Sequence, residues 1–367
     1  MPKTFIAKLR EDVGQLLIMG FDGIEVDARL SQMLTDLRPG GVILFARNLV
    51  EAAQAHALLA ACEQAVGQIL FRCVDLEGGT VDRLREVIAP APSVAEVAAT
   101  LDPRMFRRHG RILGEEARAL GFNVDFAPVL DLGMAASKEV LGTRTASADP
   151  LNVVTYAREL LRGLREAGVL GCGKHFPGLG SARVDSHSEL PLVEKPWPSL
   201  WEEDLVPYRY LRRKMRFVMV AHAAFPQVTG DRTPASISAK WMRSVLRKRI
   251  GFAGLILSDD LEMGGVLAAG PVENVAVACI EAGADMFLVC RQQALVQRAY
   301  ESVLRQAERD ERFLEKVRAA ARRVRAVKSR MRSLRHWAPT PTSKKVEQLR
   351  RSLEQFAAEV RQEGSVL

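Results

Sequence analysis

The sequence predicts an α/β protein of the (β/α)8 barrel class, folded as a single domain with a helical extension at its C-terminal end. Three observations predict this fold. Eight short apolar runs of strand character recur along the chain, and most are followed by a segment with the apolar periodicity of a helix. Polar side chains gather where these runs end, and barrel enzymes assemble their active sites at that end of the strands.

The strand-like runs are spread over most of the chain. They are Gln15–Phe21, Gly41–Phe45, Ile69–Asp75, Asn123–Asp131, Val169–Phe176, Phe217–Phe225, Gly254–Asp260 and Asp285–Cys290. Helix-length segments lie between them at Ile24–Leu37, Ala52–Val66, Phe106–Leu120, Val153–Ala167, Ala239–Arg249 and Val272–Ala282. Because strands that alternate with helices form parallel sheets, eight such units favour a closed barrel.

The last part of the chain predicts two further helices. A basic segment over Lys316–Arg335 carries one apolar stripe, and two prolines, Pro339 and Pro341, then interrupt the helical pattern. An amphipathic segment follows, with apolar residues on one face at Val346, Leu349, Leu353, Phe356 and Val360. We expect residues 1–335 to form the catalytic barrel and residues 336–367 to form a break and a helix that packs on it.

Composition excludes several classes of protein. Of 367 residues, 48% are apolar and 26% are charged, which suits a globular chain with a large core. The formal net charge is +8, but the excess is concentrated in Arg209–Arg216, Arg243–Arg249 and the Lys316–Arg335 helix. Because apolar residues recur at helical spacing in that helix, we interpret its basic face as solvated and expect no nucleic-acid partner.

The cysteines and the N-terminal segment indicate an intracellular chain. The five cysteines are odd in number and widely spaced, so we expect them to be reduced and buried rather than paired; they are Cys62, Cys73, Cys172, Cys279 and Cys290. The first residues contain no uninterrupted apolar region, and no later stretch approaches about 18 apolar residues. We therefore expect a cytoplasmic protein without membrane insertion.

The chain contains a conspicuous strand-to-loop transition near its middle. The apolar run ends in Lys174-His175, and a loop rich in glycine and proline, Phe176–Gly180, leads to Asp185-Ser186-His187. Other polar residues occupy comparable strand ends, at Asp75, Asp131, His222 and Asp259-Asp260. Since the ends of parallel barrel strands lie together, we expect these side chains to surround one site.

Several segments around these residues resemble one known family. They are Gly41–Asn48, Val74–Leu84, Leu141–Arg144, Gly173–Gly180 with Asp185-Ser186-His187, and Gly254–Met263. In this order they resemble glycoside hydrolase family 3, in its bacterial β-N-acetylglucosaminidase branch, over roughly Val13–Val327. The resemblance implies a barrel that hydrolyses a glycosidic bond with retention of configuration. We expect a monomer that needs no cofactor and no metal.

The resemblance also implies roles for three catalytic residues. Asp259, at the end of an apolar run, matches the family's nucleophile, which forms a covalent glycosyl ester. His187 matches the acid/base, and Asp185 matches the carboxylate that orients its imidazole. An imidazole titrates near neutrality, so it serves as acid and base without the burial that a carboxyl group would require.

The remaining matches concern the sugar. By resemblance, Asp75, Arg83, Arg144, Lys174 and His175 bind the N-acetylglucosamine unit at the non-reducing end. Carboxylates accept hydrogen bonds from pairs of hydroxyl groups, and cations donate to them. A metal site is disfavoured, because the histidine and aspartate spacings match no short metal motif and a lysine adjoins a histidine.

This chain departs from the branch at three positions. Leu179 stands where the branch has histidine, Thr80 where it has arginine, and Thr145-Ala146 where it has an aromatic residue after the serine-like position. Each substitution bears on loop closure or on the pocket beside the scissile bond. The larger family often adds a second sandwich domain, whereas here two helices follow the barrel, so we expect every catalytic group to come from the barrel.

The sequence thus predicts a retaining exo-β-N-acetylglucosaminidase. By implication of the resemblance, its substrates are saccharides that carry N-acetylglucosamine, such as muropeptides in peptidoglycan recycling. Two alternatives stay open. A phosphorylase would use the same residues, since a histidine acid/base does not repel phosphate as a carboxylate does. A sugar-binding protein that kept the fold and lost turnover is the other.

Overall fold

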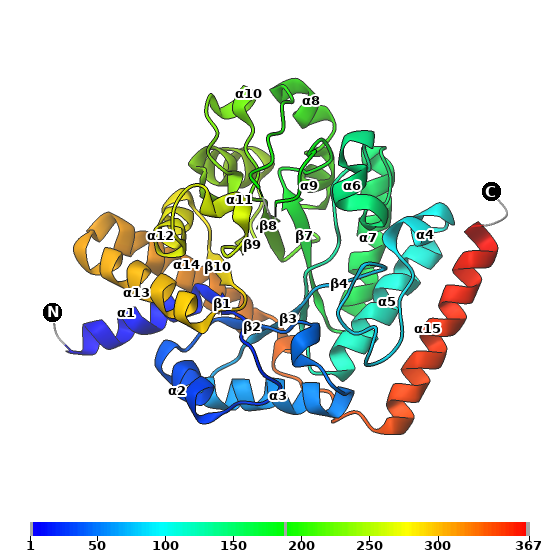
Figure 1. Cartoon of the computed structure of the whole chain (residues 1–367), viewed down its shortest axis with the longest axis horizontal. Helices are drawn as coiled ribbons and strands as arrows, with labels where there is room; N and C mark the ends of the chain where they lie inside the picture. The colour runs from blue at the N-terminus through cyan, green and yellow to red at the C-terminus, as the bar shows by residue number, and fades with distance from the viewer. Residues whose placement is uncertain (1–2, 187–188, 365–367) are drawn as a thin grey trace.

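The computed structural model describes residues 3–186 and 189–364, and its centre is a closed barrel of eight parallel strands (Figure 1). In chain order these are β1 (Leu17–Met19), β2 (Gly41–Ile43), β3 (Phe71–Val74), β6 (Val124–Asp125), β7 (Leu170–Phe176), β8 (Phe217–Val220), β9 (Leu255–Asp260) and β10 (Met286–Val289). Each strand pairs with the next, and β10 closes on β1. All eight expected runs contain one barrel strand, so the predicted fold class is confirmed.

Helices surround the barrel in the expected alternation. They are α1 (Lys3–Gln15), α2 (Ala28–Leu37), α3 (Ala52–Val66), α5 (Pro103–Ala119), α7 (Pro150–Glu166), a π-helix (Lys240–Ile250), α12 (Val272–Ala282), α13 (Gln293–Arg309) and α14 (Glu311–Arg330). α5 and α7 each begin three residues earlier than predicted, because Asp102 caps the first amide groups of α5 and Asp149 caps those of α7. A proline follows each cap at the first helical position, where a missing N–H costs nothing.

Shorter elements fill the loops at the two ends of the barrel. They are the antiparallel pair β4 (Leu76–Gly78) and β5 (Val81–Asp82), the helices α4 (Val94–Ala99), α6 (Lys138–Leu141), α8 (Trp197–Glu202), α9 (Val206–Leu211), α10 (Pro226–Thr229) and α11 (Gly264–Leu267), and several 3-10 turns. The β4–β5 pair follows directly after β3, so it lies on the same end of the barrel as the β7 and β9 C-termini. The loops at that end build the candidate site.

The basic helix predicted to reach Arg335 is shorter. α14 ends at Arg330, Met331 adopts extended backbone, and a 3-10 turn follows over Arg332–Leu334. Leu334 is fully buried among side chains of the barrel interior, including Phe71. The chain therefore leaves its helical path to bury Leu334, and tertiary packing rather than the prolines ends the helix.

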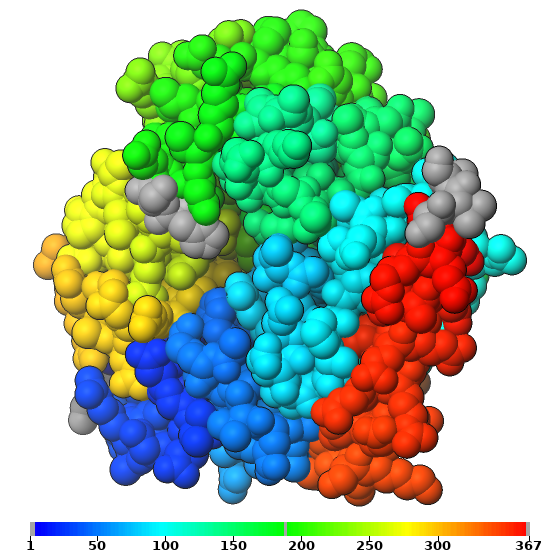
Figure 2. All heavy atoms as spheres, turned by 45° about the vertical axis from the view of Figure 1, so that its right-hand side comes forward, coloured from blue at the N-terminus to red at the C-terminus, as the bar shows by residue number. Residues whose placement is uncertain are grey.

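The last helix, α15 (Ser343–Gly364), lies along α4 and α5, where Figure 2 shows it as a red rod beside the cyan part of the chain. Its apolar face is buried, and the Phe356 ring stacks on His109 with a centroid separation of 5.8 Å. Glu359 pairs with Arg108, and Arg350 donates to the Ile88 carbonyl at 2.8 Å. The proposed division between residues 335 and 336 stays a prediction.

The interior of the barrel is packed with side chains from alternate strand positions. They include Ile18, Ile43, Phe71, Phe126, Phe217, Met219, Leu257, Met286 and Leu288. All five cysteines are free and buried, as predicted. Within the described part of the chain, the helices are too short or too polar to cross a membrane.

Asp285, directly before β10, should contribute strongly to stability. Its fully buried carboxylate accepts from the Ile256 amide at 2.8 Å and pairs with Arg247 and Arg323. We expect Asp285→Ala to lower the free energy of unfolding by about 3 kcal/mol, because one buried amide and two cations lose their partner. Urea denaturation measures this change.

The matched control is Glu315→Ala, which removes a carboxylate paired with Arg318 on the surface of α14. Exposed pairs contribute little, so its effect should stay below about 0.5 kcal/mol. Equal losses from the two variants would contradict a special role for Asp285.

Candidate active site

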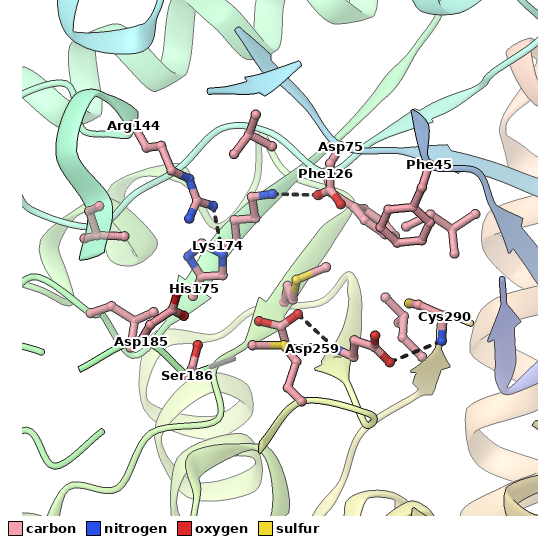
Figure 3. Close-up of a pocket in the computed structure, with 18 of the residues that line it drawn as sticks. Phe45, Asp75, Phe126, Arg144, Lys174, His175, Asp185, Ser186, Asp259 and Cys290 are labelled. Carbon is pink, nitrogen blue, oxygen red and sulfur yellow. Dashed lines mark hydrogen bonds and ion pairs between the residues drawn. The ribbon is translucent and has the colours of Figure 1, made fainter. Parts of the chain in front are cut away.

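A pocket opens at the C-terminal end of the barrel strands, where the polar strand-end residues meet (Figure 3). Its lining includes Phe45, Asp75, Arg83, Phe126, Arg144, Lys174, His175, Leu179, Asp185, Ser186, Asp259, Asp260 and Cys290. The pocket thus brings together every described residue to which the resemblance gives a catalytic or sugar-binding role, whereas the strand-end residues Asp131 and His222 do not line it. His187 lies outside the described residues.

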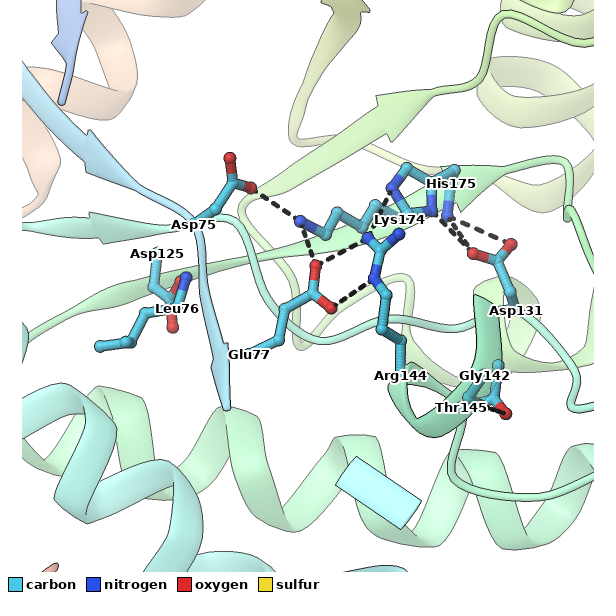
Figure 4. Close-up of polar contacts among 10 residues, drawn as sticks. All are labelled: Asp75, Leu76, Glu77, Asp125, Asp131, Gly142, Arg144, Thr145, Lys174 and His175. Atoms are coloured by element: carbon cyan, nitrogen blue, oxygen red, sulfur yellow. Dashed lines mark hydrogen bonds and ion pairs between the residues drawn. The ribbon is translucent and has the colours of Figure 1, made fainter. Parts of the chain in front are cut away.

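A buried ion network forms one wall of this pocket (Figure 4). The Lys174 Nζ lies 2.8 Å from Asp75 Oδ1 and 2.7 Å from Glu77 Oε1. Arg144 donates to both oxygens of Glu77 from Nε and Nη2, at 2.8 Å each. The side chains of Lys174 and Glu77 are 3% and 1% exposed, so the pairs are strong enough to fix their geometry.

The electrostatics keep this network ionised. Burial by itself would raise the pKa of Glu77, but the charges of Lys174 and Arg144 outweigh it and lower that pKa well below its usual range. Burial would likewise lower the pKa of Lys174, but Asp75 and Glu77 raise it above its ordinary value. At neutral pH the pocket wall is therefore a set of fixed charges.

Glu77 and Asp131 support the site. The sequence analysis placed Asp131 among the strand-end residues expected around it and gave Glu77 no role. Asp131 accepts from His175 Nδ1 at 2.7 Å and from the Leu179 amide at 2.7 Å. A carboxylate on Nδ1 holds the proton there, so Nε2 faces the pocket, 3.5 Å from Arg144 Nη2. The sequence analysis identified Asp131 as a strand-end residue but not its partners, which come from segments more than forty residues away.

Asp259 and Asp260, at the end of β9, have different environments. Asp259 is buried, which opposes ionisation, but the charges of His175 and His222 and the Asp260 amide lower its pKa below the ordinary value. Asp260 lacks such cations, and burial raises its pKa to about 7. Its Oδ1 accepts from the amides of Glu262 and Cys290, so Asp260 fixes the ends of β9 and β10.

The other predicted residues lie around the mouth and sides of the pocket. The Arg83 guanidinium lies 5.6 Å from the Phe45 ring centroid, and among the described residues its buried Nε has no hydrogen-bond partner. Asp185 and Ser186 line the pocket on the loop that follows β7. Gly178 in this loop has a φ of 138°, and a Cβ there would lie 2.9 Å from Asp204, so glycine is required.

Leu179 and Thr80, two of the departures from the family pattern, differ in whether they line the pocket. Leu179 is buried and lines the pocket, so the apolar side chain contacts the space where the branch has a histidine. Thr80 is exposed in the turn between β4 and β5 and does not line the pocket. Over residues 3–186 and 189–364, no three His, Cys, Asp or Glu side chains are arranged to hold a metal ion.

Comparison with known proteins identifies relatives of the whole barrel. The family profile described as the glycosyl hydrolase family 3 N-terminal domain matches residues 8–327. A β-hexosaminidase of Idiomarina loihiensis is 36% identical over 282 residues, which is 76% of this chain and 84% of that protein. A β-hexosaminidase of Bordetella avium is 40% identical over 264 residues, covering 70% and 75% of the two chains.

Solved structures show the same similarity. A glycoside hydrolase family 3 β-N-acetylglucosaminidase from Paenibacillus sp. superposes with a TM-score of 0.90 at 32% identity, covering 96% of this chain and 68% of that one. The β-N-acetylglucosaminidase from Thermotoga maritima gives a TM-score of 0.76 at 29% identity, covering 92% and 69%. The likeness therefore extends over nearly all of the described chain.

The ion network can be tested by replacing Glu77 and measuring how the free energy of unfolding depends on pH. Glu77→Gln should lower the free energy of unfolding by about 3 kcal/mol at neutral pH, because Lys174 and Arg144 stay buried with fewer carboxylates. The folded-state pKa of Glu77 is lowered, so its stabilisation is complete above the unfolded value, roughly pH 4.5, and is lost as the pH falls through the lowered pKa. Urea denaturation over a pH series measures this.

The difference between wild type and Glu77→Gln should be constant at neutral pH and shrink below roughly pH 4.5. Glu115→Gln is the control, since Glu115 is 45% exposed and, among the described residues, its one ion pair is a long contact of 3.8 Å with Arg111. A difference that keeps its full size in acid would show that Glu77 is not stabilised as an anion.

Proposed function

The chain belongs to glycosyl hydrolase family 3, and on that premise we propose that it is a retaining exo-β-N-acetylglucosaminidase. It is a glycoside hydrolase, and its relatives named above are β-hexosaminidases and β-N-acetylglucosaminidases. The observation that carries the mechanism is Asp259, a carboxylate with a lowered pKa that lines the same pocket as Lys174, His175 and Arg144.

The pocket favours attack on a chain end. Its base is closed by side chains of the barrel interior, among them Ile43, Phe126, Met219 and Leu288. Because a polymer cannot pass through a closed base, only a terminal sugar unit enters. Asp75, Lys174, His175, Arg83 and Arg144 stand around it as donors and acceptors for hydroxyl groups, in the sugar-binding roles that we propose for them.

In the proposed reaction, an Asp259 oxygen attacks the anomeric carbon while the bond to the leaving oxygen breaks. The leaving oxygen takes the proton of the protonated His187 imidazole, and Asp185 stabilises that imidazolium beforehand. The glycosyl ester then reacts with water, whose proton returns to His187, and the sugar leaves with its original configuration. Asp185 and Ser186 line the pocket, which supports a role for the segment that leads to His187.

The lowered pKa of Asp259 suits the first step, since only the carboxylate attacks. His175 and Lys174 also line the pocket, where they can form hydrogen bonds with the hydroxyl groups of the sugar. We propose saccharides that carry N-acetylglucosamine at the non-reducing end as substrates, with muropeptides of peptidoglycan recycling as the natural class.

The reaction class is tested with a chromogenic β-N-acetylglucosaminide, a matched β-glucoside and added inorganic phosphate. We expect release from the acetamido sugar, little from the glucoside, and free sugar as product with or without phosphate. Sugar 1-phosphate as product would replace hydrolysis with phosphorolysis. Binding of N-acetylglucosamine without any release would favour the non-catalytic alternative.

Asp259→Ala should abolish turnover, with kcat reduced by roughly 10⁴-fold or more, because the variant cannot form the ester. Steady-state hydrolysis of the chromogenic substrate measures the loss. Asp36→Ala, at an exposed position on α2, is the control and should keep the wild-type rate. Residual activity of Asp259→Ala within about tenfold of wild type would exclude Asp259 as the nucleophile.

His187→Ala should slow substrates with poor leaving groups most, because only these need a proton on the departing oxygen. A series of aryl N-acetylglucosaminides of graded leaving-group pKa measures this dependence, and Asp185→Asn should give a weaker effect in the same direction. His336→Ala, at an exposed histidine, is the control. Equal losses across the series would exclude His187 as the acid.

A further inference from the structure

The end of the barrel opposite to the active site carries a second, basic hollow. It lies at the N-terminal end of the barrel strands, since Met215 and Arg216 directly precede β8 and Gly254 directly precedes β9. The C-terminal end of α14 completes it. The five arginines that line it are Arg212, Arg213, Arg216, Arg323 and Arg330, and we call this site the basic hollow.

The hollow brings together parts of the chain that are far apart in sequence. Arg212, Arg213 and Arg216 belong to one of the basic segments noted in the sequence, and Arg323 and Arg330 belong to another. The third segment supplies Arg247, which donates to the Gly254 carbonyl at the edge of the hollow. The fold thus brings arginines from all three basic segments to this end of the barrel.

Most of this charge has no counter-charge among the residues that the structure describes. Arg213, Arg216 and Arg330 are exposed, and none of them forms an ion pair with any described residue. Asp285 is shared by Arg247 and Arg323, and no acidic side chain lines the hollow. Because like charges held close together repel, an anionic occupant would be attracted strongly.

The floor of the hollow is apolar. Met215 and Leu255 are buried beneath it, while Ala326, Val327 and Met331 are partly exposed on its α14 side. The space measures about 630 Å³. Arginine and methionine are enriched at protein interfaces, where lysine and acidic residues are depleted, and the lining of the hollow has this composition.

The positive surface continues beyond the hollow. A neighbouring groove is lined by Arg158, Arg162 and Arg165 of α7 and by Lys214, which lies between Arg213 and Met215 in the chain. Glu159 pairs with Arg158 and Arg162, but Arg165 and Lys214 form no ion pair within the described chain. Arginines and a lysine therefore line two hollows whose residues adjoin in sequence at Arg213-Lys214.

We propose that the basic hollow binds an acidic segment of another protein chain. Carboxylates of that segment pair with Arg213, Arg216 and Arg330, and its aliphatic side chains cover Val327 and Met331. A single-stranded nucleic acid is less suited, because the hollow has no aromatic side chain on which a base would stack. A lipid surface is less suited, because a flat bilayer cannot reach a recessed apolar floor.

The proposal is tested with a fluorescein-labelled peptide in which glutamate and leucine recur at helical spacing, and with the same peptide carrying glutamine for glutamate. Fluorescence anisotropy measures binding to the full chain. The hollow variant combines Arg213→Glu, Arg216→Glu and Arg330→Glu. The matched control variant combines Arg29→Glu, Arg309→Glu and Arg312→Glu, which removes three exposed arginines elsewhere with the same change in net charge.

We expect the glutamate peptide to bind the wild type, the hollow variant to bind about tenfold more weakly or worse, and the control variant to change less than about twofold. Hydrolysis by both variants should equal that of the wild type, since the hollow is on the far end of the barrel. That rate also verifies folding, and Arg213→Gln with Arg216→Gln replaces the triple variant if it fails to fold.

Several outcomes would overturn the proposal. Absence of peptide binding to the wild type would do so, as would equal losses from the hollow and control variants, or equal binding of the glutamine peptide. A thymidine oligonucleotide or phosphatidylglycerol vesicles that bound more tightly than the peptide, and lost binding in the hollow variant, would assign the hollow to nucleic acid or to a membrane surface instead.

Discussion

The candidate site depends on one buried ammonium group, that of Lys174. It is held by the carboxylates of Asp75 and Glu77, and Glu77 in turn holds Arg144 with two parallel hydrogen bonds. Each carboxylate or cation alone would be costly to bury, whereas the alternating set is stabilised by its own charges. The network links β3, β4, β7 and the turn at residues 142–144, so it aligns four segments around one pocket.

The acidic residues of the site divide into two kinds. Glu77, Asp131 and Asp260 are turned toward backbone amides or cations of the protein, and they fix strands, a loop and an imidazole ring. Asp259 instead remains ionised against the pocket, because the surrounding histidines and Lys174 lower its pKa. A supporting group needs all its oxygens satisfied by the protein, while a reacting group must present one to the substrate.

The barrel topology also separates two surfaces with different properties. Loops at the C-terminal ends of the strands place acids and bases around a pocket whose base is closed by the barrel interior. Segments at the N-terminal ends place five arginines around an apolar hollow, and three of these, Arg213, Arg216 and Arg330, form no ion pair with a described residue. Parallel strands make this separation automatic, because every loop that enters a strand lies at the end opposite to every loop that leaves one.

The sequence by itself determined the strands, most of the helices and the chemical type of the residues that meet in the pocket. Apolar periodicity is a local property, and strand-end residues share one end of any parallel barrel, so Asp75, Lys174, His175 and Asp259 could be brought together without coordinates. The helix end at Arg330 was misplaced, because the burial of Leu334 that decides it is a long-range contact.

Only the tertiary structure decided which charges pair. Glu77 and Arg144 are 67 residues apart, and nothing in their local sequence says that one carboxylate serves both Arg144 and Lys174. The same holds for the basic segments, which as periodic stripes indicated solvated faces but which each bring at least one arginine to one hollow or its edge. The physical reason is that pairing energy depends on distance and burial in space, and neither quantity is written in the order of residues along the chain.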